Sequence, residues 1–284
     1  MNVWLSIDFD YFVREMPDWD WSHGEASFFT GTDIWYIREA QMLASGVDLR
    51  AETDPDKHAE PKPLDFFKRL HDLGFNFART PLYVADSHAF GYPVFSNARA
   101  TKTQHIVHID AHHDLGYKVE LVAQHLHTEE ADCGDWLLMT LLKKRKVRPH
   151  IIYPKWKGLY EWEHSWGRMA DRSSYARKVL RIARVADPLV WDDAAVAELA
   201  GKVNCIFICR SDSWVPPWLD QLFIDFVNSA SELTGAVPLN VFQRHEKFDP
   251  LKKREYSHAQ VLAMSKSFKE AEEKFLNGQS KVAK

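Results

Sequence analysis

The sequence predicts an α/β fold in which a mostly parallel sheet is covered by helices on both faces. Short apolar runs rich in β-branched residues alternate with longer segments of helical periodicity, which is typical of such sheets. Polar residues follow several apolar runs directly, as expected where functional side chains lie beyond the carboxyl ends of parallel strands. No strong linker, internal repeat or low-complexity segment interrupts this pattern, so we expect a single domain over residues 1–284.

The apolar runs predict the strands of the sheet. The clearest runs lie at residues 2–8, 81–85, 105–109 and 204–209, and shorter ones at 151–153 and 237–241. Segments with apolar residues at helical spacing predict the covering helices, at residues 33–45, 64–73, 134–146, 192–200, 218–233 and 257–276. Residues 177–186 fit either a short helix or a strand.

Capping signals predict where several of these helices begin and end. Thr32 is a suitable N-cap for the first helix, and Gly46 and Gly74 are suitable stops for the first and the second. Ser257 and Gln260 match a capping box at the start of the last helix.

Four segments are expected outside regular structure or are ambiguous. Residues 11–30 are rich in aromatic side chains, and we expect them to form an ordered loop over the functional site. Residues 50–63 are charged and contain three prolines, which predicts an exposed connection. Residues 153–166 place aromatic side chains among charges, which fits either packing or a peptide-binding wall. Residues 277–284 are expected to fray.

Composition and charge exclude several classes of protein. A formal net charge of −4 gives no basic footprint for nucleic acid, and no apolar run reaches the roughly 20 residues that a membrane span needs. The amino terminus lacks the charged and apolar regions of a signal peptide. Cys133, Cys205 and Cys209 are odd in number and lack Cys-x-x-Cys spacing, which indicates reduced thiols. We therefore expect a cytoplasmic protein without nucleic-acid or membrane partners, and the sequence leaves open whether it forms a homo-oligomer.

Two of the predicted strands end in acidic residues at spacing two. Asp8 and Asp10 close the first strand, and Asp110, His112 and Asp114 follow the strand at 105–109. If the chain stays extended there, residues two apart point to the same side. Unpaired carboxylates are costly to bury, and a shared cation removes that cost. This pattern predicts a metal site.

A third strand, at residues 81–85, is followed by Asp86, Ser87 and His88, which adds a histidine to the candidate set. The candidate metal ligands are Asp8, Asp10, His88, Asp110, His112 and Asp114. Four carboxylates and two imidazoles exceed what one zinc ion takes, and this oxygen-rich set suits two Mn²⁺ ions. Two such ions would hold a bridging water and lower its pKa, so that hydroxide forms near neutral pH.

These segments resemble the signatures of arginases and other ureohydrolases. Asp-Ala-His-His-Asp at 110–114 is similar to their Asp-Ala-His-x-Asp motif, Ser-Ile-Asp-Phe-Asp at 6–10 to their Ser-x-Asp-x-Asp motif, and residues 86–88 to their Gly-Gly-Asp-His segment. In those enzymes the Ser-x-Asp-x-Asp strand comes last, whereas here it opens the chain, as after a circular permutation. Segments 5–12, 108–115, 134–136 and 209–217 most resemble the peptide arginases, which convert arginine to ornithine in ribosomally made peptides.

The resemblance implies an arginase-like three-layer sandwich with two Mn²⁺ ions. Asp8 and Asp110 would bridge both ions, His88 and Asp114 would complete one, and His112 and Asp10 the other. Asp114 would also act in catalysis by orienting the bridging hydroxide. That hydroxide would attack the guanidinium carbon, and the tetrahedral intermediate would collapse to urea and an amine.

Two departures from the free-arginine enzymes indicate a peptide substrate and leave other roles open. Those enzymes read the substrate carboxylate with polar side chains soon after the Asp-x-His-x-Asp motif, where this chain has Leu115 and Gly116. A substrate whose carboxylate is already an amide needs no such reader. The position of their proton-shuttle histidine corresponds here to Cys133, so His125 and His127 are the candidate shuttles.

The residue that would anchor the guanidinium group is also open, with Glu25, Glu129 and Glu130 as candidates. Our catalytic set is therefore Asp114, His127 and Glu130. A general acid within reach of the leaving nitrogen would add about 10²–10⁴-fold to the rate.

The sequence thus predicts a binuclear manganese hydrolase that acts on arginine residues of a precursor peptide. One alternative is a ureohydrolase of a small guanidino or formimino compound, which would release urea from free arginine or agmatine. Another is a non-catalytic peptide-binding module whose metal holds the fold, which would show no turnover with manganese. A zinc-dependent deacylase is a further alternative, and one zinc ion per chain would favour it.

Overall fold

A computed structural model describes residues 1–16, 28–98, 103–117, 119–144, 146–165, 181–182, 185–240 and 256–282. Its centre is a parallel sheet in which the described strands lie in the order β5-β4-β3-β1-β6-β2-β7. The strands are β1 (Asn2–Asp8), β2 (Leu82–Ala85), β3 (Gln104–Ile109), β4 (Val147–Tyr153), β5 (Asp187–Val190), β6 (Lys202–Cys209) and the two-residue β7 (Leu239–Asn240). The predicted α/β class with a parallel sheet is confirmed.

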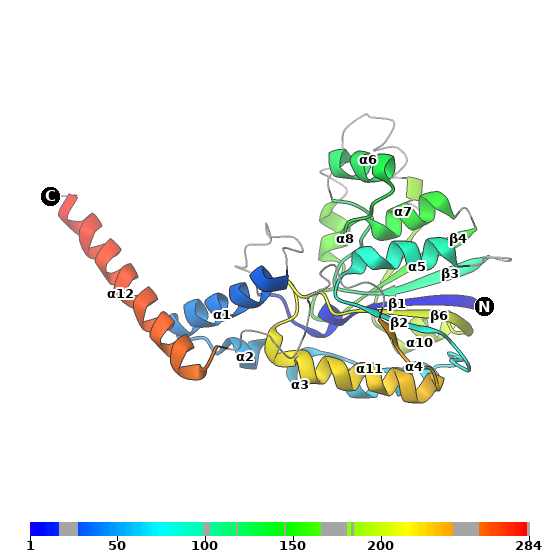
Figure 1. Ribbon diagram of the computed structural model, residues 1–284, viewed down its shortest axis with the longest axis horizontal. Coiled ribbons are helices and arrows are strands. Elements are labelled where there is room, and N and C mark those ends of the chain that lie inside the picture. Colours follow the sequence, from blue (N-terminus) through cyan, green and yellow to red (C-terminus); the bar gives the residue numbers. More distant parts are fainter. Residues whose placement is uncertain are drawn as a thin grey trace.

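Helices cover both faces of this sheet (Figure 1). On one face lie α5 (Gly91–Asn97), α6 (Val119–Thr128), α7 (Trp136–Lys143) and α8 (Tyr160–Ser165). On the other face lie α4 (Phe66–Asp72), α10 (Asp193–Glu198) and α11 (Asp220–Thr234). The predicted layers are therefore present, because each face of the sheet is apolar and needs a cover.

β1 shows how the strands serve both layers. It is buried from Val3 onward and lies between β3 and β6. Leu5 and Ile7 pack into the core under α4 and α11, whereas Trp4 packs on the opposite face. Because side chains alternate, Ser6 and Asp8 also lie on the Trp4 face, beneath α5 and α7. A buried strand thus carries polar groups into one layer only.

The core on the face of α4 and α11 is strongly aromatic. The ring of Phe226 lies 5.0–5.8 Å from the rings of Phe9, Phe12, Phe66 and Phe67, centroid to centroid. All five side chains are almost fully buried. Tilted and edge-on rings at this spacing add attraction beyond the burial of apolar area.

α1 (Phe28–Ala44) and α12 (His258–Val282) lie beside one another at one end of the sheet, and α12 extends away from the body (Figure 1). Tyr36 and Ala40 of α1 pack against Val261 of α12. The predicted capping box is present, because Ser257 N donates to Gln260 Oε1 at 2.8 Å and Gln260 N donates to Ser257 Oγ at 3.3 Å. The helix then continues to Val282, beyond the expected end near residue 276.

Several local expectations are wrong. Thr32 is not an N-cap, because α1 already begins at Phe28. The segment 50–63 is not simply an exposed connection: α2 (Leu49–Glu52) and α3 (Pro55–His58) form there, and Thr53 and Ala59 are buried. Aspartates cap both helices, since Asp48 accepts from Ala51 N and Asp54 from Asp56 N.

The elements β5, α5, α6 and α8 were not expected either. β5 contains Pro188, a residue that fits an edge strand, and β5 is the edge strand beside β4. α5 and α6 fall in segments whose apolar spacing is weak in the sequence. Some of the segments discussed above lie outside the described residues. These are residues 17–27 of the expected aromatic loop, Trp166, residues 177–180 and residues 183–184.

The aromatic residues of segment 153–166 do not share one environment. Tyr153 is fully buried in the core with α7, whereas Tyr160 is 67% exposed at the start of α8. Trp156 donates from Nε1 to Tyr11 O at 3.1 Å. Packing therefore accounts for Tyr153 and Trp156.

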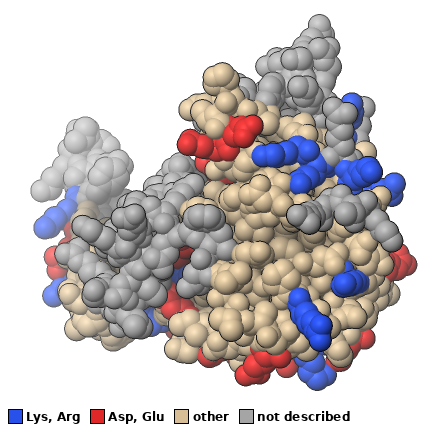
Figure 2. Space-filling view, turned by 45° about the vertical axis from the view of Figure 1, so that its right-hand side comes forward, with Lys and Arg blue, Asp and Glu red and all other residues tan. Residues whose placement is uncertain are grey.

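In the described part of the chain, none of the helices has the length and apolar character of a membrane span. The face shown in Figure 2 carries Lys and Arg as well as Asp and Glu side chains, separated by a broad uncharged area.

Replacing Phe226 with alanine should lower the free energy of unfolding by about 3–5 kcal/mol, the usual cost of deleting a buried phenylalanine. Urea unfolding followed by fluorescence measures this loss. Ile224→Ala, on the same helix but 44% exposed, is the matched control and should change stability by less than about 0.5 kcal/mol. Equal effects of the two substitutions would contradict the packing described for α11.

Candidate metal centre

The candidate ligands meet at the carboxyl edge of the central strands. Asp8 is the last residue of β1, Asp110 follows β3 directly, and His88 opens the short helix η4 (His88–Phe90) after β2. Cys209, the last residue of β6, pairs in register with Asp8. Because all of these strands are parallel, their carboxyl ends bring the segments together at one edge.

His88 lies among three carboxylates. Its Nδ1 is 2.8 Å from Asp8 Oδ2, 3.2 Å from Asp110 Oδ2 and 3.4 Å from Asp114 Oδ2. Its other ring nitrogen, Nε2, is 2.8 Å from Ser6 Oγ. All five side chains are buried. The serine thus fixes the ring so that Nδ1 faces the acidic groups.

His112 has a matching arrangement on the other side of Asp110. Its Nδ1 is 2.9 Å from Asp10 Oδ2 and 3.6 Å from Asp110 Oδ1, and its Nε2 is 3.2 Å from Glu15 Oε1. Asp10 itself lies in the short helix η1 (Phe9–Phe12). Asp110 therefore presents one carboxylate oxygen to His88 and the other to His112.

The chain gathers these groups by turning, and the expectation of an extended segment after the strand is wrong. β3 ends at Ile109, and His112 N donates to Asp110 Oδ1 at 2.6 Å within a tight turn. Asp114 has φ +51°, a left-handed conformation that aspartate tolerates better than most residues. Its Oδ2 accepts from Trp136 Nε1 at 2.6 Å, so α7 holds the carboxylate in place.

Burial and mutual repulsion shift the titration of this cluster. Burial, and then the neighbouring carboxylates, raise the pKa of Asp10 and Asp114 well above the ordinary value. Burial lowers the pKa of His88 and His112, but contacts with aspartates outweigh it and leave both raised. Burial alone would raise the pKa of Asp110, but the imidazoles around it hold that pKa well below the ordinary value. The cluster is thus short of positive charge.

The donor set fits divalent cations. Three groups each bring their donor atoms within 4.8 Å of one another: Asp8, His88 and Cys209; His88, His108 and Asp110; and Asp10, Asp110 and His112. No Lys or Arg among the described residues forms an ion pair with the four aspartates, and Asp110 Oδ2 has no hydrogen-bond partner there. Buried carboxylates in this state need cations, and carboxylates with imidazoles suit Mn²⁺, Zn²⁺ or Fe²⁺.

Several residues of this cluster were missed by sequence reasoning. His108 belongs to the apolar strand before Asp110, and strand alternation places both on one face, which was a usable signal. Ser211 Oγ donates to Asp8 Oδ2, and Cys209 pairs with Asp8 across the sheet. Glu15 comes next to His112 only through the fold, so no sequence signal could identify it.

The other predicted catalytic residues lie elsewhere. His127 and Glu130 are exposed at the end of α6, and neither side chain forms a hydrogen bond or ion pair within the described ranges. Glu129 is exposed as well, and Glu25 lies outside the described residues. His125 Nδ1 is 2.5 Å from Asp135 Oδ2. The catalytic roles of His127 and Glu130 therefore stay predictions.

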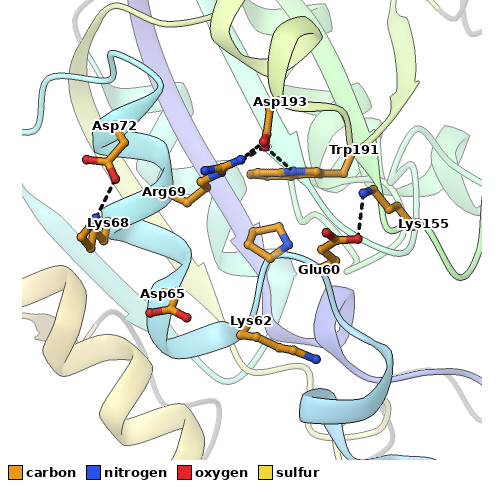
Figure 3. A pocket seen from close by; sticks show the side chains of 10 residues that line it. Glu60, Lys62, Asp65, Lys68, Arg69, Asp72, Lys155, Trp191 and Asp193 are labelled. Carbon is orange, nitrogen blue, oxygen red and sulfur yellow. Dashed lines mark hydrogen bonds and ion pairs between the residues drawn. The ribbon is translucent and has the colours of Figure 1, made fainter.

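A separate hollow of about 400 Å³ opens on the surface (Figure 3). Its charged side chains pair with one another, as Lys155 with Glu60, Arg69 with Asp193 and Lys68 with Asp72. Trp191 Nε1 at its wall also donates to Asp193, at 3.1 Å. None of the candidate ligands lines this hollow, so the metal centre is the better candidate functional site.

No family model, curated protein or solved structure matches this chain. The structure shows an α/β protein with buried groups of aspartate, histidine and cysteine that could hold metal.

Protein stripped of divalent cations should become less stable as the pH rises. Above about pH 6.5 the raised pKa values of Asp10, Asp114, His88 and His112 let the folded chain bind more protons than the unfolded chain. The lowered pKa values of Asp110, Glu15 and His108 have no effect there, because these groups are deprotonated in both states. Stabilisation by a group with a raised pKa is complete below its ordinary pKa and is lost as the pH passes through the raised one, so the free energy of unfolding should fall as the pH rises above about 6.5. Urea unfolding at each pH measures this, and saturating Mn²⁺ should weaken or reverse the trend. A rise with pH in stripped protein would contradict the cluster's shortage of positive charge.

Arg210 orders the turn that follows β6 near the centre. The side chain is 7% exposed, and its guanidinium donates to Asp212, to Asp220 (Nε to Oδ1, 2.8 Å) and to Pro216 O at 3.2 Å. One arginine thereby joins the strand end to the start of α11.

Arg210→Met should lower the free energy of unfolding by roughly 2–4 kcal/mol, because it removes the buried guanidinium that pairs with the partly buried carboxylates of Asp212 and Asp220. The exposed pair Lys68–Asp72 is the control, and Lys68→Met should change stability far less, because water and salt screen an exposed pair. Thermal and urea unfolding of both variants check the difference. A small effect at Arg210 would mean that water solvates Asp212 and Asp220 in the folded protein.

Proposed function

We propose that this chain is a binuclear manganese hydrolase that cleaves the guanidinium group of arginine residues in a ribosomally made precursor peptide, leaving ornithine and releasing urea. The proposal combines the resemblance of segments 6–10, 86–88 and 110–114 to ureohydrolase signatures with the meeting of these segments at one edge of the sheet. In it, Asp8 and Asp110 bridge the ions.

The observation that carries the proposal is how the two histidines are oriented. His88 and His112 both present Nδ1 to carboxylates, while their Nε2 atoms contact Ser6 and Glu15. Histidines that ligate metals commonly bond their second nitrogen to such a partner, which fixes the ring. Asp110 between them, with one oxygen toward each, is placed as a bridge would be.

Two divalent cations held there would supply Lewis acidity and a water activated as a nucleophile. The chain's own residues would orient the reacting groups. Trp136 Nε1 and the left-handed backbone fix Asp114, so that its carboxylate can direct the nucleophile. His127 is proposed to return a proton to the leaving nitrogen, and Glu130 to bind the guanidinium group.

The choice of a peptide over free arginine follows from what comes after the motif. Leu115 is fully buried and Gly116 has φ +89°. A Cβ at Gly116 would lie 2.6 Å from Val122 Cγ2, so this position cannot carry a polar side chain without rearrangement. A reader of the substrate carboxylate is therefore missing there, which suits a substrate whose carboxylate is an amide.

Incubation of the Mn²⁺-loaded protein with arginine-containing peptides should lower the peptide mass by CN₂H₂ for each arginine converted, measured by mass spectrometry with urea release in parallel. Asp110→Asn should reduce the rate by at least about 10²-fold, the scale for losing one electrostatic contact in a transition state. Asp187→Asn, at an exposed aspartate of β5, is the matched control and should leave the rate unchanged.

Other outcomes would identify a different activity. Urea from free arginine or agmatine, with none from peptides, would indicate a ureohydrolase of small compounds. Peptide binding without turnover would indicate a binding module, and a single zinc ion per chain would count against the binuclear scheme.

A further inference from the structure

His108 is a buried histidine for which the ligand scheme above has no use. It lies in β3, its side chain is fully buried, and neither ring nitrogen has a hydrogen-bond partner among the described residues. Its neighbours include the rings of His88 and Trp136, at 5.1 and 5.3 Å between centroids. An imidazole with both nitrogens buried and unbonded is unfavourable, so a missing partner is indicated.

The ring points its Nε2 at the same carboxylates as His88. Nε2 of His108 is 3.2 Å from Asp110 Oδ2 and 3.6 Å from Asp114 Oδ2, while Nδ1 of His88 is 3.2 and 3.4 Å from the same two oxygens. Asp110 Oδ2 also lacks a hydrogen-bond partner in the part of the chain that the structure describes. An unpaired nitrogen and an unpaired oxygen therefore face each other.

These separations are those of ligands that share one ion. Two donors bound at about 2.0–2.1 Å, at angles between a right angle and the tetrahedral angle, lie about 2.8–3.4 Å apart. Three of the four separations around His88 and His108 lie within that range, and the fourth, 3.6 Å from His108 Nε2 to Asp114 Oδ2, lies just beyond it. A small movement of the two aspartates on binding would bring all four donors onto one cation.

We propose that His108 Nε2 is a further ligand of the ion held by His88, Asp110 and Asp114, so that the two metal positions of the centre differ. One position then has two imidazoles, and the other, with Asp10 and His112, has one. The inference deepens the proposed function and rests on it only for the presence of metal. Because imidazole favours Zn²⁺, Co²⁺ and Fe²⁺ more than carboxylate does, the position with His108 should fill first and hold such ions more tightly.

The test measures how many ions the protein binds and how tightly. His108→Leu removes the donor and keeps an apolar side chain in a buried place. His105→Leu is the matched control, because His105 lies in the same strand on the opposite face, where it bonds to His150 at 2.9 Å. Equilibrium dialysis against Mn²⁺ and Co²⁺ with elemental analysis gives the number and affinity of bound ions.

Wild type and His105→Leu should bind two ions, and His108→Leu should bind one of them at least about 10–100-fold more weakly, the scale found for supporting contacts of metal sites. Two ions bound by His108→Leu with unchanged affinity would overturn the inference. In that case the substitution should raise thermal stability in stripped protein, since it removes unbonded polar atoms.

A second measurement needs no variant. Pulsed EPR of the wild-type protein with one equivalent of Co²⁺, an ion that favours imidazole, counts the imidazole nitrogens on the first ion bound. Two nitrogens are expected, and one would overturn the proposal even if His108→Leu failed to fold.

These outcomes are separate from those of the proposed function. Loss of one ion in His108→Leu, with no hydrolysis of any guanidino substrate, would leave His108 as a ligand and remove the arginase-like activity. If the wild type hydrolysed peptides but had only one imidazole on the first ion, the arginase-like activity would stand and the ligand role of His108 would fall. A wild type that binds no divalent ion would overturn both.

Discussion

The carboxyl edge of the sheet, which carries the candidate metal centre, depends on holding four buried carboxylates close together. Asp8, Asp10, Asp110 and Asp114 are each less than 5% exposed, and among the described residues they pair with His88 and His112 but with no lysine or arginine. Hydrogen bonds from Ser211, Trp136 and backbone amides offset only part of that cost. The parallel sheet supplies the close approach, and cations would supply the charge. A cation bound at this edge would therefore stabilise the fold.

The sheet limits the cost of these buried polar groups by keeping them on one face, so that the other face stays apolar. The aromatic core beneath α4 and α11 is apolar, with Phe226 and its neighbours in contact. The opposite face takes the polar groups Ser6, His108 and Asp8 into a layer that also holds Trp136. Alternation along two adjacent strands is enough to produce this division.

The class of fold could be predicted from the sequence, because apolar runs that alternate with helical segments are local patterns. An apolar run followed by acids is also a local pattern, and it drew attention to the segments that meet at one edge of the sheet; the ligand roles of the six candidate residues stay predictions. The sequence did not predict the partners that only the fold assembles. Glu15 reaches His112 from a distant segment, and β5 carries Pro188, which weakened its strand signal. His108 was treated as part of the apolar strand, although its spacing from Asp110 marked the shared face. His127 was chosen as a substitute, because the family's shuttle position holds Cys133 in this chain, and local pattern could not place its side chain.

The left-handed backbone of Asp114 has a consequence for how this loop can change during evolution. Asparagine shares the tolerance of aspartate for that conformation, whereas β-branched residues do not. An exchange to asparagine would keep the course of the chain and remove one negative charge. The loop can thus pass from an acidic to a neutral form in a single step, while most other replacements would first have to reshape it.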